Sequence, residues 1–200
     1  MRVGLATIQR ERHEHLARQA GGVARQLVAP ERYLVVSMDP DPPRVAAGEV
    51  LHLPVPPGRP LPLAAARNAA LDALSDLDLA ILLDVDCIPG PELVGRYAAA
   101  ARGPAGAGLL AGPVGRLEAR DARAAAPSQA ALARARGRGD GRPAPPAGVV
   151  VPEPRVELFW SLSFAVGPAV HARIGGFDPG YVGYGAEDTD YAFRARAAGV

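Results

Sequence analysis

Two aspartates, Asp84 and Asp86, follow directly on an uninterrupted apolar run, Leu79 to Leu83. Side chains alternate between the faces of a strand, so both carboxylates are expected to project to the same side. A continuous apolar run is typical of a parallel strand buried on both faces, and open α/β sheets bind ligands beyond the carboxyl ends of such strands. Two carboxylates there can hold one hard cation or address its phosphate ligands. The Pro-Gly-Pro that follows indicates a turn, and the competing interpretation is that both acids are only solvated turn groups.

A second acidic group, Glu187, Asp188 and Asp190, follows an aromatic and glycine-rich approach that contains Tyr184 and Gly185. Glycines allow tight turns and leave room for a ligand close to the main chain. Acids in the first turn of a helix also favour the helix dipole, which is a purely structural explanation for part of this group. A carboxylate in a partly enclosed aromatic site is a candidate general base, because burial raises its pKa. One acidic group would then hold metal and phosphate, and the other would activate a hydroxyl.

Alternating strands and helices are expected to position these groups. Apolar runs predict strands at Val3 to Ile8, Tyr33 to Met38, Val50 to Val55, Leu79 to Asp84 and Leu109 to Val114. Periodic patterns predict helices at Glu11 to Leu27, Leu63 to Leu74, Pro91 to Ala101 and Glu187 to Ala198, the last stopped by Gly199. Strands that alternate with helices imply right-handed βαβ units and a mostly parallel sheet with helices on both faces.

Composition limits the class of protein. The 200 residues fit one domain with a sizeable core, and a net charge of +1 gives no electrostatic case for nucleic acid as a partner. The single cysteine, Cys87, excludes an intramolecular disulfide and a cysteine zinc cluster. The N-terminus lacks a signal-peptide apolar region, and no apolar run reaches bilayer-spanning length. A cytoplasmic, soluble protein is expected, with any membrane association peripheral.

Residues 118–148 differ from the rest of the chain, because they are rich in Ala, Arg, Gly and Pro and almost lack large apolar residues. Such a segment cannot bury enough apolar surface to order itself, so we predict a mobile insertion. Its arginines could attract phosphate or an anionic surface, but a solvated loop is the simpler interpretation.

Four short motifs occur in order: the Leu63 to Ala70 helix with its Arg67-Asn68 pair, Asp84-Val85-Asp86, a strand with Phe159-Trp160-Ser161, and Gly183 to Asp188. Together they resemble a family 2 glycosyltransferase of the GT-A fold, close to the galactosyltransferase-like branch. The resemblance covers most of the chain outside residues 118–148. It implies a single catalytic domain over residues 1–200, with the Rossmann-like mixed sheet of nucleotide-diphospho-sugar transferases.

The resemblance also implies an activity, that of a metal-dependent, inverting hexosyltransferase. The donor would be a nucleotide-diphosphate sugar, with a UDP-sugar favoured, and the acceptor a hydroxyl of a glycan, lipid or small molecule. On the donor side, Asp86 would bind the Mn²⁺ or Mg²⁺ ion that bridges the diphosphate. Asp84 would contact the ribose or the sugar, Arg67 would face the nucleotide diphosphate, and Asp39 would face the nucleobase.

On the acceptor side, the resemblance makes Asp188 the catalytic base that deprotonates the acceptor hydroxyl. Glu187 would orient the acceptor or the donor sugar. Trp160 would offer an apolar face to a sugar ring, and Tyr184 and Gly185 would line the same sugar-binding side.

The sequence departs from the family pattern at two places. The first strand runs into Thr7-Ile8-Gln9-Arg10, where the family has a more standard turn. The family commonly supplies a metal-binding histidine one strand after the Glu-Asp helix, where this chain ends at Val200. The four histidines, His13, His15, His52 and His171, do not fall at that position. Either the sequence is a C-terminally truncated fragment, or Asp86 binds the metal more weakly with water and phosphates.

Two alternatives compete with the transferase. A haloacid-dehalogenase-like phosphatase also uses Asp-x-Asp after a strand, and Glu187-Asp188-Thr189-Asp190 imitates its later acidic motif. That family needs Gly-Thr after the aspartates, where this chain has Cys87-Ile88, and a phosphate-binding lysine, whereas all 22 basic residues here are arginine. The second alternative is an inactive sugar-nucleotide-binding module.

Overall fold

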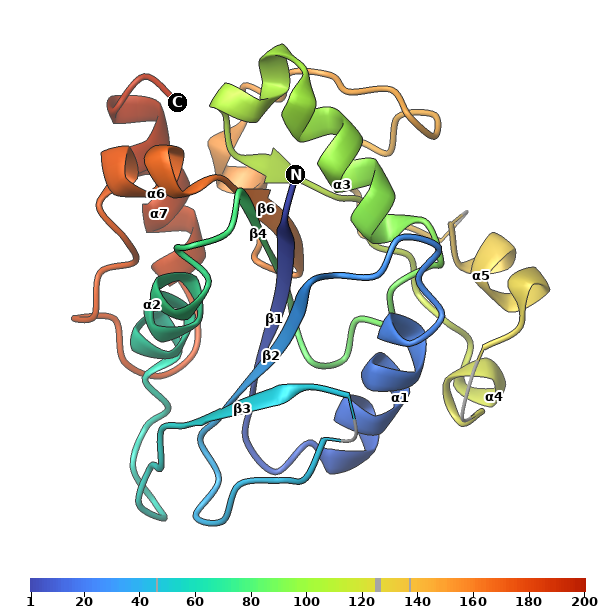
Figure 1. Ribbon diagram of the computed structural model, residues 1–200, viewed down its shortest axis with the longest axis vertical. Coiled ribbons are helices and arrows are strands. Elements are labelled where there is room, and N and C mark those ends of the chain that lie inside the picture. Colours follow the sequence, from blue (N-terminus) through green and yellow to red (C-terminus); the bar gives the residue numbers. More distant parts are fainter. Residues whose placement is uncertain (46, 125–126, 137) are drawn as a thin grey trace.

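The computed structural model describes residues 1–45, 47–124, 127–136 and 138–200. Within these ranges the chain forms a six-stranded sheet in the order β3-β2-β1-β4-β6-β5 (Figure 1). The strands are β1 (Val3–Gln9), β2 (Arg32–Ser37), β3 (Glu49–His52), β4 (Leu79–Leu83), β5 (Leu110–Ala111) and β6 (Ser163–Val166). Strands β1 to β4 pair in parallel, whereas β6 is antiparallel to both β4 and β5. The predicted mostly parallel, mixed sheet is confirmed.

Helices cover both faces of this sheet. The α-helices are α1 (His13–Val23), α2 (Leu63–Ala73), α3 (Leu93–Arg102), α4 (Ala119–Ala122), α5 (Gln129–Arg136), α6 (Pro168–Ile174) and α7 (Glu187–Ala197). Two short 3₁₀ helices are η1 (Pro104–Ala107) and η2 (Val156–Leu158). Helices α2, α6 and α7 lie on one face, and α1 and α3 lie on the other (Figure 1).

Strand β4 explains why its sequence is an unbroken apolar run. Leu79, Ile81 and Leu83 belong to the core under α1 and α3, whereas Ala80 and Leu82 belong to the core under α2, α6 and α7. Because alternate side chains enter two different cores, every position of the strand must be apolar. The strand ends at Leu83, so the two aspartates that follow it lie on a turn at the carboxyl edge of the sheet.

A buried glutamine of α1 fixes that turn. The Gln19 Nε2 group donates hydrogen bonds to the carbonyl oxygens of Asp84 (2.8 Å) and Cys87 (3.1 Å), and its Oε1 accepts one from the Tyr33 hydroxyl (2.9 Å). Gly22 also approaches the turn closely, since a Cβ there would lie 2.8 Å from the Pro89 ring. Helix α1 therefore packs directly against the turn that carries Asp84 and Asp86.

The observed elements follow the expected order with several corrections. Helices α2 and α7 match their predicted ranges to within a residue, whereas α1 is shorter at both ends and α6 was not predicted. The interpretation of Phe159 to Ser161 as part of a strand is wrong. Strand β6 begins at Ser163, which pairs with Leu83 at the end of β4, so residues 159–161 have no strand beside them. Phe159 instead turns inward, with its ring centre 5.3 Å from that of Phe164.

The segment 118–148 contains helices α4 and α5, which lie beyond α1 at the side of the molecule (Figure 1). Arginine–acid pairs connect its parts: Arg134 lies 2.8 Å from Asp121, and Arg138 lies 2.9 Å from Glu118. The mobility of the segment stays a prediction. No helix in the described ranges is long and apolar enough to cross a bilayer.

Candidate active site

Two of the acids predicted to do chemistry, Glu187 and Asp84, pair with one buried arginine, Arg67. Arg67, on the second turn of α2, donates from Nη1 to Glu187 Oε1 at 2.6 Å and from Nη2 to Asp84 Oδ1 at 3.4 Å. The side chains of Arg67 and Glu187 are only 7% and 5% exposed, and that of Asp84 is 29% exposed. The guanidinium also lies over the Phe177 ring, 5.7 Å from its centre. The ion pair thus joins α2, α7 and the end of β4.

The carboxylates of this cluster carry more negative charge than Arg67 can neutralise. The pKa of Asp84 is raised to about 6, mainly by burial; Arg67 opposes this shift, and the negative charges of Asp86 and Asp188 add to it. Asp86 is exposed, and its carboxylate accepts a long hydrogen bond from the Cys87 thiol at 3.9 Å. A cation bound at Asp84 and Asp86 would relieve this repulsion, because an opposite charge favours the ionised carboxylate.

Asp188 is held by main-chain donors. Its Oδ2 accepts a hydrogen bond from the Ser161 N–H at 3.1 Å, and its Oδ1 accepts one from the Thr189 N–H at 2.8 Å. The neighbouring Glu187 keeps one buried oxygen, Oε2, without a hydrogen-bond partner in the described part of the chain. A buried acceptor in that state is costly, and a hydroxyl or water placed beside it would satisfy it.

The turn before α7 depends on residues that accept a left-handed backbone. Gly183 and Gly185 have φ values of +100° and +105°, and Ala186, the N-cap residue, has a φ of +73°. The Gly183 N–H donates to the Leu61 carbonyl at 2.9 Å, which ties this turn to the start of α2. Tyr184 is fully exposed. Its predicted sugar-binding role, like that of Gly185, stays a prediction.

Asp39 forms a second group at the carboxyl edge of the sheet. Its buried carboxylate accepts hydrogen bonds from Gln9 Nε2 at 2.7 Å and from the Glu11 N–H at 2.6 Å. His13 Nε2 lies 3.8 Å from the same carboxylate, and His52 Nε2 lies 2.9 Å from the Asp39 carbonyl oxygen. Gln9 and His13 were not identified from the sequence, because only their distance from Asp39 in space marks them.

Trp160 is the remaining predicted site residue, and it is 37% exposed. Its ring is covered by Arg142, whose guanidinium carbon lies 5.5 Å from the ring centre. Arg142 belongs to the segment 118–148. The composition of this segment shows many arginines, but it does not indicate which of them contacts Trp160.

The acids at this edge have the chemistry of a divalent-cation site, but they do not form a complete one. Within the described residues, no three His, Cys, Asp or Glu side chains are grouped so that they could hold a metal ion. Mg²⁺ and similar hard cations are nonetheless commonly bound by one or two carboxylates, with phosphate and water as the other ligands. Asp86, with Asp84 beside it, fits that limited role.

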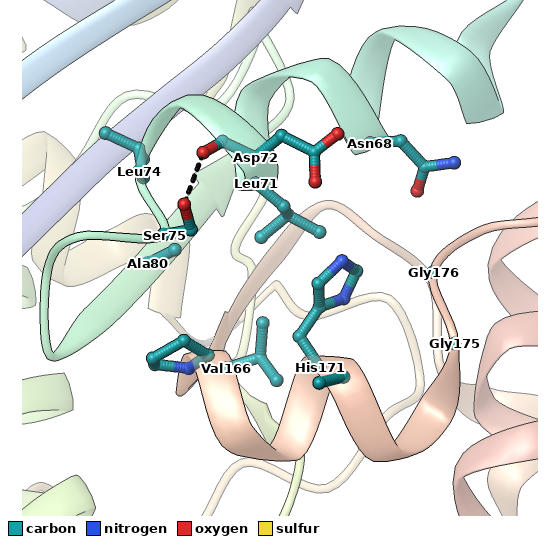
Figure 2. A pocket seen from close by; sticks show the side chains of 12 residues that line it. Asn68, Leu71, Asp72, Leu74, Ser75, Ala80, Val166, His171, Gly175 and Gly176 are labelled. Atoms are coloured by element: carbon teal, nitrogen blue, oxygen red, sulfur yellow. Dashed lines mark hydrogen bonds between the residues drawn. The ribbon is translucent and has the colours of Figure 1, made fainter.

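A separate cavity of about 430 Å³ lies between α2 and α6 (Figure 2). Leu71 and Val166 line its apolar part, and His171 rises from α6 toward Leu71 and Asp72. The His171 Nδ1 atom is 2.9 Å from the Tyr191 hydroxyl. None of the predicted site residues lines this cavity, so the hollow and the acidic cluster are different places on the molecule.

Comparisons with known proteins support the fold. No protein-family model and no curated protein matches the sequence. S. aureus TarS 1-349 in complex with UDP aligns with a TM-score of 0.64 and 14% identity, covering 99% of this chain and 56% of that one. The mannosyltransferase PcManGT from Pyrobaculum calidifontis, in complex with GDP-Man and Mn²⁺, aligns with a TM-score of 0.60 and 15% identity, covering 97% and 51%.

The catalytic domain of Drosophila β1,4-galactosyltransferase 7, in complex with xylobiose, aligns with a TM-score of 0.52 and 18% identity, covering 99% of this chain and 62% of that one. At these identities the likeness shows the fold alone. It confirms the predicted GT-A fold, whereas membership of family 2 stays a prediction. The chain spans about half to three fifths of the length of these three structures.

Replacing Arg67 tests the buried ion pair. We expect Arg67→Ala to lower the free energy of unfolding by about 3 kcal/mol, because it leaves Glu187 and Asp84 without their shared cation. The matched control is Arg32→Ala, since Arg32 pairs at 2.8 Å with the exposed Asp76. Its loss should stay below about 1 kcal/mol, as is usual for surface pairs. Urea denaturation measures both, and equal losses would contradict the proposed weight of the Arg67 pair.

His171 should make stability depend on pH. Burial lowers the pKa of His171 from its ordinary value of 6.5, although Asp72 opposes this shift. The unfolded chain then binds the proton more tightly than the folded one, so stability falls as pH drops below about 6.5. We expect His171→Gln to flatten the decline in unfolding free energy between about pH 7 and pH 5. His15→Gln is the control, and an unchanged decline in the His171 variant would refute the assignment.

Proposed function

We propose that this chain is the nucleotide-sugar-binding part of a metal-dependent, inverting glycosyltransferase. The observation that carries the proposal is the pairing of Asp84 and Glu187 with the buried Arg67, with the charges of Asp86 and Asp188 acting on Asp84, at the carboxyl edge of a GT-A sheet. In open α/β sheets, ligands bind at that edge. A UDP-sugar is the favoured donor, and the acceptor is a hydroxyl of a glycan, lipid or small molecule.

On the donor side, Asp86 together with Asp84 would hold Mn²⁺ or Mg²⁺. The ion would supply charge neutralisation for the departing nucleotide diphosphate, which is a poor leaving group without it. Arg67 is fixed by its pair with Glu187 and keeps Asp84 at the edge of the sheet. Asp39, already oriented by Gln9 and the Glu11 N–H, can accept a hydrogen bond only, so it would face an N–H group of the base.

On the acceptor side, Asp188 would accept the proton of the attacking hydroxyl. The two N–H groups that donate to it hold the carboxylate in place. The acceptor oxygen forms a bond to the anomeric carbon, and the bond between that carbon and the diphosphate oxygen breaks, with the electron pair leaving on the diphosphate. A single displacement of this kind inverts the anomeric configuration, so no carboxylate nucleophile is required.

The GT-A fold argues against the haloacid-dehalogenase-like alternative. The chain also lacks the lysine that such a phosphatase needs. In addition, Arg67 pairs with the carboxylate of Asp84, which would have to act as the nucleophile of the phosphatase. An inactive binding module would show the same cluster, so turnover is the property that separates it from the transferase.

Calorimetry with a panel of UDP- and GDP-sugars, with and without Mn²⁺, tests the proposal, and a sugar-release assay follows for each sugar that binds. Metal-dependent binding with slow release of sugar supports the transferase, and binding without turnover supports the module. Cleavage of a simple phosphomonoester with no nucleotide binding would refute the proposal in favour of the phosphatase. Thermal stabilisation by each nucleotide sugar gives an independent measure of binding.

Asp86→Ala should abolish the Mn²⁺-dependent part of donor binding, because it removes the exposed carboxylate of the proposed cation site. Asp41→Ala is the matched control, since Asp41 is also an exposed acid after a strand of the same edge. Isothermal calorimetry with the best donor of the panel measures both. Donor binding that stays metal-dependent in the Asp86 variant would remove this residue from the site.

Asp188→Asn should leave donor binding intact and lower the transfer rate by a factor of about 10² to 10⁴, the usual contribution of a general base. Asp190→Asn serves as its control, because Asp190 is in the same helical turn but pairs with Arg194 at 2.8 Å. Steady-state assays measure the transfer rate of both variants. An unchanged rate for Asp188→Asn would refute the assignment of Asp188 as the base.

A further inference from the structure

Asp140 and Arg142 form a largely buried ion pair near the C-terminal end of the segment 118–148. Arg142 donates from Nε to Asp140 Oδ2 at 2.8 Å, and its own backbone N–H donates to Asp140 Oδ1 at 3.1 Å. Its Nη2 lies 2.7 Å from the same Oδ2 but is not aligned for a second hydrogen bond. The side chains of Arg142 and Asp140 are only 6% and 9% exposed. A segment with so few apolar residues therefore buries most of one arginine side chain.

The same guanidinium makes two contacts with Trp160. Its guanidinium carbon lies over the indole, 5.5 Å from the ring centre, and its Nη1 donates to the Trp160 carbonyl oxygen at 3.3 Å. Trp160 is thus held at its ring and at its main chain, while more than a third of the residue stays exposed. A large aromatic face that is fixed and open to solvent is suited to stack on the C–H face of a sugar ring.

The carbonyl of Trp160 and the N–H of Ser161 belong to one planar peptide group. Arg142 binds the carbonyl side of this group, and Asp188 binds its N–H side at 3.1 Å. A rotation of the peptide would break both hydrogen bonds together. Each bond also polarises the peptide in the sense that strengthens the other. The side chain at the end of the segment 118–148 is therefore connected to the proposed base through a single peptide group.

We propose that Arg142, fixed by Asp140, is a positioning residue that sets the Trp160–Ser161 peptide and through it both the exposed indole and the Asp188 carboxylate. The inference rests on the proposed function, because it takes the indole as a sugar platform and Asp188 as the base. It makes the end of the segment 118–148 a part of the active site instead of a separate surface loop.

The three contacts need the shape of an arginine. A guanidinium can stack on a ring with its flat face while its edge donates to a carboxylate and a carbonyl in its plane. A lysine ammonium keeps the charge and can pair with Asp140, but it cannot make all three contacts at once. Arg142→Lys therefore removes the positioning function while it avoids leaving Asp140 buried without a cation.

Because Trp160 is the only tryptophan, its fluorescence reports on the contact without any substrate. We expect Arg142→Lys to shift the emission to the red and to increase quenching by acrylamide, since the indole loses its cover. The control is Arg134→Lys, because Arg134 pairs with Asp121 at 2.8 Å in the same segment. Emission and quenching equal to those of the control would overturn the proposal.

Transfer kinetics, with the UDP- or GDP-sugar that the wild-type protein turns over, supply the second measurement. Arg142→Lys should lower kcat by about tenfold, the effect of a modest loss of alignment, and change the Kd for UDP with Mn²⁺ by less than about twofold. In an Asp188→Asn background the same substitution should add less than its full tenfold loss, because one of the two groups that it positions, the proposed base, is already gone. A full additional loss in that background, or an unchanged kcat, would refute the proposal. Failure of the proposed function itself would differ, since the wild-type protein would bind no nucleotide sugar.

Discussion

The site depends on the burial of one guanidinium between two carboxylates. Arg67 and Glu187 are 120 positions apart in the chain, yet their 2.6 Å hydrogen bond is almost closed to solvent. Neither charge could stay buried alone, because an unpaired ion in the interior is strongly destabilising. The pair therefore requires α2, α7 and the end of β4 to come together, and this requirement brings Asp84 and Asp188 to the same edge.

The arginine also leaves the charge of the site incomplete. Arg67 pairs with Asp84 and Glu187, and Asp86 and Asp188 add two further negative charges; burial first, and then these charges, raise the pKa of Asp84. A structural ion-pair network would be expected to approach neutrality, because uncompensated carboxylates lower stability. An acidic excess beside one exposed carboxylate is what a site for a cation and its phosphate ligands requires. This physical argument supports the proposed donor site independently of any likeness between folds.

The sequence predicted those elements whose formation depends on neighbouring residues along the chain. Strand β4 was identified because burial on both faces demands an unbroken apolar run, and α7 because acids open it and Gly199 closes it. Asp84, Asp86, Glu187 and Asp188 were identified with these elements. The sequence did not predict the turn at Phe159, because the start of β6 depends on where its neighbour β4 ends. The partners of Asp39 and Arg142 could not be predicted either, since a sequence shows charged residues but not which of them meet.

The Asp140–Arg142 pair shows how a segment poor in apolar residues can still hold a defined position. Buried ion pairs add little net stability, because the loss of hydration offsets most of the attraction. What such a pair does impose is geometry, since a planar guanidinium accepts partners only along its edge and on its flat faces. In this protein the N–H groups of Arg142 donate to Asp140 and to the Trp160 carbonyl oxygen, and its guanidinium carbon lies over the indole ring. The pair is thus better explained by the position that it gives to Trp160 than by the stability that it adds to the segment.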